Sequence, residues 1–188
     1  MPSNCKIAMD LDGVLADTIQ TLCKILNVRH SAAYTPAVFD RWNAWEVVRI
    51  SREEFLRTLD EAWFNWKEVP AMEEDLAAKV SRLNKFGTVD IVTGRSEVTV
   101  PFAQEWLQYH KIPYVKFVRT ASGSAKADLD YDIFIDDSDY LMSLIASRLF
   151  GFGILYTQPW NRSATEMPRI FRVNNWDEIL RVIEQIQR

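Results

Sequence analysis

Two acidic residues lie one position apart near the start of this 188-residue sequence, in the segment DLDGVLAD. Asp10 and Asp12 fall at the end of an apolar run, residues 5–11, that predicts a buried strand. Residues i and i+2 of a strand point the same way, so both carboxylates would face one pocket, and Gly13 allows a sharp turn beside them. Such a pair can share a cation or divide into nucleophile and acid. The alternative is a polar strand end followed by a turn glycine.

A hydroxyl, a glycine and a guanidinium follow a second apolar run at residues 88–92. Thr93, Gly94 and Arg95 together suit an anionic oxygen, above all a phosphate, because each offers a hydrogen-bond donor. Thr-Gly turns are common, so this segment indicates a phosphate site only if it lies close to the acidic residues.

Two further acids, Asp136 and Asp137, come directly after the apolar residues 132–135. Unpaired carboxylates at that place would be costly, so we expect a counterion. Magnesium suits the role, because it takes a few carboxylates and keeps positions for water and phosphate. Lys126 precedes Asp136 by ten positions. By itself it would be a solvated lysine, but near carboxylates and a phosphate its ammonium would hold them together.

Short apolar runs that alternate with helical segments must position these side chains. Strands are predicted at residues 5–11, 88–92, 114–118, 132–135, 153–156 and 170–173, and helices at 99–110, at 139–149 and after a cap at Asn175. The alternation predicts an α/β fold with a parallel sheet covered on both faces. Ligands of such sheets bind beyond the carboxyl ends of the strands, which is where the acids and Thr93 lie.

The region from residue 18 to residue 86 interrupts this alternation with helix signals and no convincing strand. Asp17 is expected to cap a first helix, Ser51 opens a capping box with Glu54, and residues 72–86 carry an apolar stripe. We therefore predict a core of residues 1–17 and 87–188 and a helical insertion of residues 18–86.

Composition argues against several classes of protein. A net charge of −4 without a basic stripe argues against a nucleic acid polymer as partner, and no apolar stretch approaches the roughly 20 residues of a membrane span. Acidic residues interrupt the first apolar run too early for a signal peptide, and two cysteines without metal-ligand spacing indicate free thiols. We expect a cytoplasmic protein that binds a small phosphorylated metabolite. The oligomeric state stays open, with a dimer as one option.

Taken in order, DxDG, Thr-Gly, a lysine and Asp-Asp resemble the four motifs of the haloacid dehalogenase-like phosphatase superfamily. The helical insertion between the first two motifs resembles the cap domain of that superfamily in its commonest location. The resemblance implies a Rossmann-like core with a small helical cap over residues 18–86.

Longer segments resemble one family more closely, the 5'(3')-deoxyribonucleotidases of the pyrimidine type. They are DLDGVLAD, LYTQPWNR (155–162), NNWDEIL (174–180) and the aromatic-rich EAWFNWKEVPAMEEDL (61–76). The sequence differs from that family at Thr18, where those enzymes tend to have an aromatic residue that helps to hold the base, and at Gly94-Arg95, where they have Ser-Pro. These differences leave the chemistry intact and concern the nucleotide specificity.

The resemblance also implies a mechanism, magnesium-dependent hydrolysis of a phosphate monoester through an aspartyl-phosphate. Asp10 attacks phosphorus, and Asp12 protonates the leaving alcohol and then activates the water that frees the enzyme. Magnesium is held by Asp10, Asp136 and the backbone carbonyl of Asp12, while Asp137 orients these ligands.

In this mechanism Thr93, Gly94 and Lys126 bind the phosphate. Most aromatic residues of the insertion are expected to form the core of the cap, although a few can stack on a substrate ring. Trp160 would either wall the site or pack under the cap. The candidates for substrate contact are one guanidinium and three indoles: Arg95, Trp42, Trp45 and Trp160.

Three functions stay open at this point. The first, which we predict, is a phosphatase of small monoesters such as (deoxy)nucleoside monophosphates. The second is a phosphatase of the same fold that acts on non-nucleotide phosphates. The third is a phospho-acceptor regulatory module, but receiver modules are smaller, have no helical insertion after strand one and carry the phospho-acceptor on a middle strand.

Overall fold

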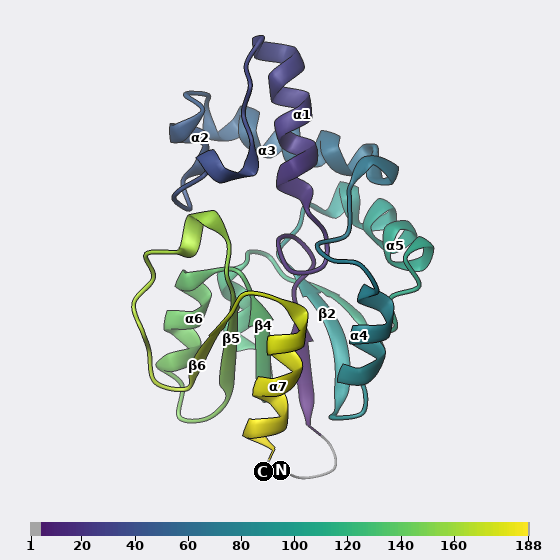
Figure 1. The fold of residues 1–188 in the computed structure, drawn as a ribbon, viewed down its shortest axis with the longest axis vertical. Helices are drawn as coiled ribbons and strands as arrows, with labels where there is room; N and C mark the ends of the chain where they lie inside the picture. The colour runs from purple at the N-terminus through teal and green to yellow at the C-terminus, as the bar shows by residue number, and fades with distance from the viewer. Residues whose placement is uncertain (1–4, 188) are drawn as a thin grey trace.

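Six parallel strands form one sheet at the centre of the protein (Figure 1). The computed structural model describes residues 5–187, and the strands follow the order β3-β2-β1-β4-β5-β6 across the sheet. Their bounds are β1 (Lys6–Met9), β2 (Thr88–Thr93), β3 (Phe117–Arg119), β4 (Ile133–Asp136), β5 (Phe152–Tyr156) and β6 (Ile170–Val173). The predicted α/β class is confirmed, because every pair of neighbouring strands is parallel.

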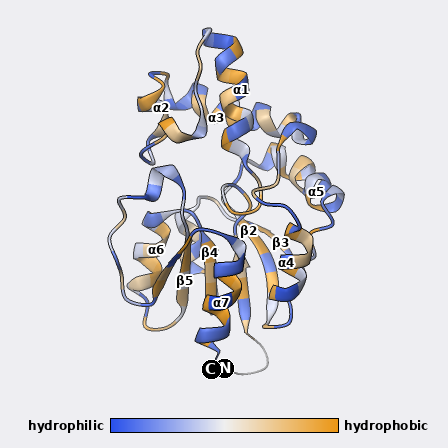
Figure 2. Cartoon of the chain, in the orientation of Figure 1, coloured by the Kyte–Doolittle hydropathy of each residue, from blue (hydrophilic) through white to orange (hydrophobic). Residues whose placement is uncertain are grey.

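Both faces of the sheet are apolar and covered by helices. Ile7 and Met9 pack into the cluster on one face, and Ala8 packs into the cluster on the other, as the period of two in a strand requires. The first face carries α4 (Leu76–Leu83), α5 (Val100–Tyr109) and α7 (Trp176–Ile186), and the second carries α6 (Asp139–Ala146). Figure 2 shows largely hydrophobic strands between helices of mixed character. None of the helices within residues 5–187 is long and apolar enough to cross a membrane.

The insertion forms a helical layer beyond the carboxyl ends of the strands (Figure 1). It contains α1 (Thr18–His30), α2 (Ala44–Val47) and α3 (Arg52–Phe64), whose apolar side chains form a cluster of their own. Asp17 and Ser51 are confirmed as the N-caps of α1 and α3. Asp17 accepts a hydrogen bond from the backbone N–H of Gln20 at 3.0 Å, and Ser51 accepts one from that of Glu54 at 3.0 Å. The 3₁₀ segments are η1 (Pro36–Val38), η2 (Trp66–Glu68), η3 (Glu97–Thr99), η4 (Ser124–Asp128) and η5 (Pro159–Asn161).

Several predicted elements are shorter in the structure, among them the first strand, predicted at 5–11 and observed at Lys6–Met9. The helix predicted at residues 72–86 begins only at Leu76, because Asp75 adopts the left-handed region with φ 54°. The strand predicted at 114–118 begins at Phe117, since Val115 is exposed. The helix predicted at 139–149 ends at Ala146.

The position of α4 bears on how the chain divides into core and insertion. Leu76, Val80 and Leu83 of this helix pack into the cluster that contains Ile7 and Met9, and α4 lies beside α7 against the sheet (Figure 1). The division at residue 86 stays a prediction, while α4 itself contributes to the core of the sheet.

Truncation of Leu83 measures that contribution. Leu83→Ala is expected to lower the free energy of unfolding by about 2–5 kcal/mol, because it removes a fully buried side chain and leaves a cavity. Urea unfolding followed by tryptophan fluorescence measures the change. The control is Leu149→Ala, at a side chain that is 97% exposed, where a change within about 0.5 kcal/mol is expected. Equal effects in the two variants would contradict the assignment of α4 to the core.

Candidate active site

The ends of three neighbouring strands bring the predicted acids together. Asp10 directly follows β1, and its backbone N–H donates to the carbonyl of Ile135 in β4 at 2.9 Å. Asp136 is the last residue of β4, and Thr93 is the last residue of β2. Because β2, β1 and β4 are adjacent and parallel, these residues lie at the same edge of the sheet, beneath the helical layer.

Lys126 links the two strand ends that carry Asp10 and Asp136. Its ammonium lies 2.8 Å from Asp10 Oδ1 and 2.7 Å from Asp136 Oδ2, and its side chain is only 5% exposed. Burial opposes the charge of Lys126, but the two carboxylates outweigh that effect and raise its pKa. The reading of Lys126 as a solvated surface lysine is therefore wrong, because η4 carries it inward to the acids.

Three buried carboxylates form the candidate metal centre. Asp10, Asp136 and Asp137 each offer an oxygen atom within 4.8 Å of the others. Burial first, and then the charge of Asp136, raises the pKa of Asp10 to about 7, and the same two causes raise the pKa of Asp137 well above its ordinary value. The single ammonium of Lys126 does not neutralise three carboxylates, so the cluster can bind a further positive charge. A donor set made only of oxygen atoms fits a hard divalent cation such as Mg²⁺.

Asp137 lies within this cluster and is held from the loop after β5. The indole N–H of Trp160 donates to Asp137 Oδ2 at 3.0 Å, and the amide of Asn161 donates to the Asp137 carbonyl at 2.8 Å. Gly13 presses against the same carboxylate, and a Cβ at that position would collide with Oδ2 of Asp137. The Trp160 ring also packs against the apolar cluster of the insertion, so it contacts both parts of the protein.

Asp12 is directed to a different set of partners. Its Oδ1 accepts hydrogen bonds from Thr18 Oγ1 at 2.5 Å and from Trp63 Nε1 at 3.0 Å, and both of its oxygens contact the guanidinium of Arg95. Burial by itself would raise the pKa of Asp12. The charge and hydrogen bonds of Arg95, together with the hydrogen bonds from Thr18 and Trp63, hold that pKa below its ordinary value. Its carboxylate is not part of the cluster around Asp137.

Two of the residues predicted to bind phosphate, Thr93 and Gly94, lie at the end of β2. Thr93 is buried, and its hydroxyl accepts a hydrogen bond from the backbone N–H of Arg95 at 3.3 Å. Gly94 lies against the loop that leads to Lys126, because a Cβ there would come within 2.5 Å of the backbone nitrogen of Gly123. Glycine is thus required for the close approach of these two loops.

The candidates for substrate contact separate in the structure. Trp42 is 51% exposed on the insertion, whereas Trp45 packs edge to face on Phe55 with 6.2 Å between ring centroids and belongs to the core of the insertion. Arg95 and Trp160 reach the acids, through Asp12 and Asp137 respectively.

Three groups at the site were not predicted from the sequence. Thr18 and Trp63 hold Asp12, and Gln158 donates to the carbonyl of Gly13 at 2.6 Å. In the sequence Thr18 stands out only as a departure from a family pattern, and Trp63 is one of the aromatic residues of the insertion, most of which are expected to form the core of the cap. Their side chains gain a role only because α1 begins and α3 ends beside the loop after β1, which carries Asp12.

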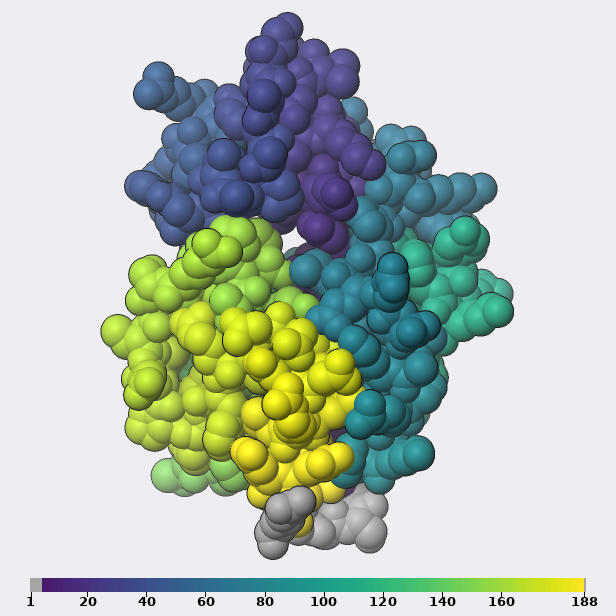
Figure 3. Space-filling view, viewed as in Figure 1, coloured from purple at the N-terminus to yellow at the C-terminus, as the bar shows by residue number. Residues whose placement is uncertain are grey.

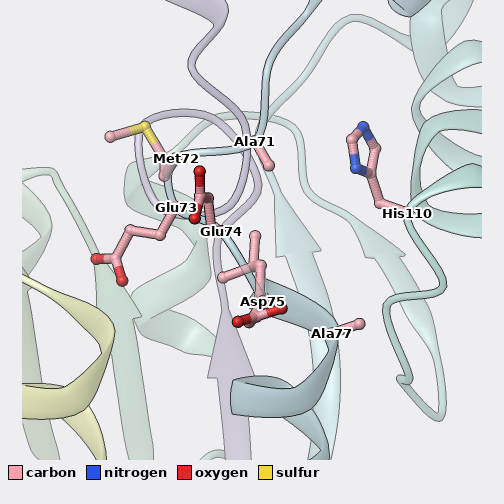
Figure 4. Close-up of a pocket in the computed structure, with 8 residues that line it drawn as sticks. Ala71, Met72, Glu73, Glu74, Asp75, Ala77 and His110 are labelled. Carbon is pink, nitrogen blue, oxygen red and sulfur yellow. The ribbon is translucent and has the colours of Figure 1, made fainter.

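The surface is hollowed where the insertion meets the core. Figure 3 shows this hollow between the insertion and the segment around η5. A second cavity, of about 470 Å³, lies away from the acids and is lined by residues 71–77 and His110 (Figure 4). Its Glu73 already accepts hydrogen bonds from Lys79, Tyr156 and the backbone of Trp176. The candidate active site is therefore the cluster at the strand ends rather than the cavity of Figure 4.

Solved structures share this fold. A haloacid dehalogenase-like family hydrolase from Streptococcus pneumoniae matches with a TM-score of 0.68 at 15% identity, covering 97% of this chain and 99% of that one. A predicted phosphatase from Clostridium acetobutylicum matches with a TM-score of 0.64 at 16% identity and the same coverage. A predicted phosphoglycolate phosphatase from Haemophilus somnus has a TM-score of 0.59 at 13% identity, again over 97% and 99%. At these identities the likeness shows the fold, and no curated protein matches the chain significantly.

The fold is that of the haloacid dehalogenase-like hydrolases to which these structures belong. Within that class a family model described as "5' nucleotidase, deoxy (Pyrimidine), cytosolic type C protein" matches residues 4–187. The chain belongs to this family. Both resemblances predicted from the sequence are thereby confirmed, and so is the prediction that the chain is a hydrolase of phosphoric monoesters.

Two glycines of the site provide a test of its packing. Gly13 has φ +73° and faces Asp137, so Gly13→Ala is expected to strain the backbone and displace that carboxylate. We expect a loss of about 1–3 kcal/mol in the free energy of unfolding and a fall in phosphatase activity. Urea unfolding and hydrolysis of p-nitrophenyl phosphate measure the two effects. The control is Gly123→Ala, where a Cβ meets no atom within 4 Å; equal behaviour of the two variants would contradict the tight fit at Gly13.

Proposed function

We propose that the protein is a magnesium-dependent phosphatase of (deoxy)nucleoside monophosphates that acts in the cytoplasm through an aspartyl-phosphate on Asp10. The contact of Lys126 with Asp10 and Asp136 is the observation that carries this proposal. It places a permanent positive charge beside a buried carboxylate at a strand end, where a phosphate dianion can approach a carboxylate only if positive charge offsets their repulsion.

The metal in this proposal is held by Asp10 and Asp136, with the backbone carbonyl of Asp12. Asp137 shares the same cluster, so it either orients these ligands or joins them. When bound, Mg²⁺ supplies positive charge that neutralises the phosphate and the acids and stabilises the charge of the transition state.

In the first step Asp10 attacks phosphorus. Oδ1 of Asp10 already accepts hydrogen bonds from Lys126 and from the backbone N–H of Leu11 at 2.8 Å, which leaves Oδ2 for the attack. As the P–O bond to the alcohol breaks, its electron pair goes to the leaving oxygen, and Asp12, which takes up a proton only when the anionic substrate lies beside it, donates that proton to the leaving oxygen. Thr93, the N–H of Gly94 and Lys126 bind the phosphoryl oxygens.

In the second step water attacks the aspartyl-phosphate. Asp12 is now a carboxylate, and Arg95, Thr18 and Trp63 stabilise that form. It takes the proton from water, phosphate leaves, and Asp10 is regenerated. The same residue thus acts as acid and then as base.

Replacement of the proposed nucleophile tests the mechanism. Asp10→Asn is expected to reduce magnesium-dependent hydrolysis of p-nitrophenyl phosphate by at least about 10³-fold, because an amide cannot form the acyl-phosphate. Removal of divalent metal with EDTA should abolish the wild-type activity, and added Mg²⁺ should restore it. Asp130→Asn, at a carboxylate that is 85% exposed, is the control and should retain full activity. Full activity of Asp10→Asn would contradict the mechanism.

A substrate panel tests the proposed substrate class. We expect deoxy- and ribonucleoside monophosphates to be hydrolysed with kcat/KM values at least about 10-fold above those of sugar phosphates, because stacking of a base on an aromatic ring contributes about 1–3 kcal/mol. Phosphate release measured under identical conditions gives the comparison. A preference for sugar phosphates would contradict the nucleotide assignment and leave the chemistry at Asp10 intact.

A further inference from the structure

We propose that Arg95 is a positioning residue for Asp12, the proposed acid and base, rather than a ligand of the substrate phosphate. This inference rests on the proposed function, because it assumes that Asp12 transfers the proton. It assigns to the guanidinium after the Thr-Gly pair a role in aiming one carboxylate at the leaving oxygen.

The first observation is that both terminal nitrogens of Arg95 already have protein partners. Nη2 contacts both carboxylate oxygens of Asp12, and Nη1 donates to Thr99 Oγ1 at 3.1 Å. Nε is buried and has no hydrogen-bond partner among the described residues. A phosphate that bound to Nη2 would therefore have to displace Asp12.

The second observation is that Arg95 is fixed along its whole length. Its guanidinium carbon lies 4.0 Å from the ring centroid of Trp63, which is a stacking distance, and the side chain is only 5% exposed. Thr99, which accepts from Nη1, is itself fully buried and donates to the carbonyl of Ser96 at 2.8 Å. Because Trp63 and Thr99 hold Arg95 in one position, Arg95 in turn holds the carboxylate of Asp12 in one position.

The third observation is how the partners of Asp12 divide between its two oxygens. Oδ1 is contacted by Thr18, Trp63 and Arg95, whereas Oδ2 is contacted by Arg95. The Asp12 side chain stays 34% exposed, in contrast to the 5% of Arg95. Oδ2 is consequently the oxygen with room for the proton, and Arg95 sets the direction in which it points.

Arginine suits this task better than lysine. A planar guanidinium can contact both oxygens of a carboxylate and stack on an indole at the same time, whereas an ammonium is a point charge that does neither in a fixed geometry. The identity of residue 95 therefore matters beyond its charge, and a lysine there should not replace it fully.

The test compares substrates that differ in their need for a proton. Nitrophenolate leaves readily without protonation, whereas an alkoxide needs the acid. Arg95→Met, which keeps an apolar side chain against Trp63, should therefore lower kcat for the best alkyl phosphate of the panel by at least about 10-fold more than kcat for p-nitrophenyl phosphate. KM should change by less than about 3-fold for both substrates, since ground-state binding is kept. Arg95→Lys should recover only part of the loss.

Two further variants make the result specific. Asp12→Asn should show the same discrimination between leaving groups, and the Arg95→Met/Asp12→Asn double variant should be slower than Asp12→Asn by no more than about 2-fold, because both changes remove one function. Arg119→Met is the matched control, since Arg119 also ends a strand of this sheet but pairs with Glu97 at 3.4 Å. It should leave both rates unchanged.

The outcomes separate this inference from the proposed function. An equal rise in KM for both substrates would assign Arg95 to the phosphate, and an equal fall in kcat would assign it a merely structural role; either result overturns the inference. Wild-type protein without magnesium-dependent activity, or an active Asp10→Asn variant, overturns the proposed function and the inference with it. Leaving-group discrimination in Arg95→Met and Asp12→Asn, with Arg119→Met unchanged, supports both.

Discussion

Three carboxylates buried side by side, with one ammonium between two of them, govern the physical chemistry of this protein. Asp10, Asp136 and Asp137 repel one another more strongly in a buried site than they would in water. Lys126 offsets part of that repulsion through its contacts with Asp10 and Asp136. Removal of one partner of such a buried pair typically costs about 3–5 kcal/mol, whereas an apolar replacement of the whole group is often neutral or stabilising. Stability therefore does not account for the cluster, whereas binding of a cation and a phosphate does. The parallel sheet holds the cluster in place.

The insertion and the core meet at the side chains that hold the acids. Trp63 of α3 and Thr18 of α1 donate to Asp12, which belongs to the core. In the opposite sense Trp160 of the core packs against the apolar cluster of the insertion and donates to Asp137. Asp12 and Asp137 thus each accept from an indole N–H whose position depends on how the two parts pack. Because indoles combine a large apolar surface with one donor, they can fill the interface and orient a carboxylate at once.

Much of the fold and part of the site could be predicted from local patterns. Strands buried on both faces read as continuous apolar runs, so β4 was predicted to within one residue of its observed bounds, and Asp10, Thr93 and Asp136 were placed at strand ends. The limits of α4 and β3 were less accurate, because a left-handed residue at Asp75 and the exposure of Val115 depend on the surrounding chain. Arg95 was assigned to the substrate, since a guanidinium suits any anion and the sequence does not say that its nearest anion is Asp12.

The sequence by itself determined the chemical types and their order along the chain: a carboxylate pair after one strand, a hydroxyl and guanidinium after the next, a lysine, and a second pair of acids. These depend on the apolar runs that precede them, and such runs are local. The tertiary structure alone decided which acid meets which partner. It directs Asp137 to the cluster with Asp10 and Asp136, directs Asp12 to Arg95, Thr18 and Trp63, and buries Lys126. The physical reason is that a carboxylate binds any donor within reach, and reach is determined by how helices and loops far apart in the sequence pack over the strand ends.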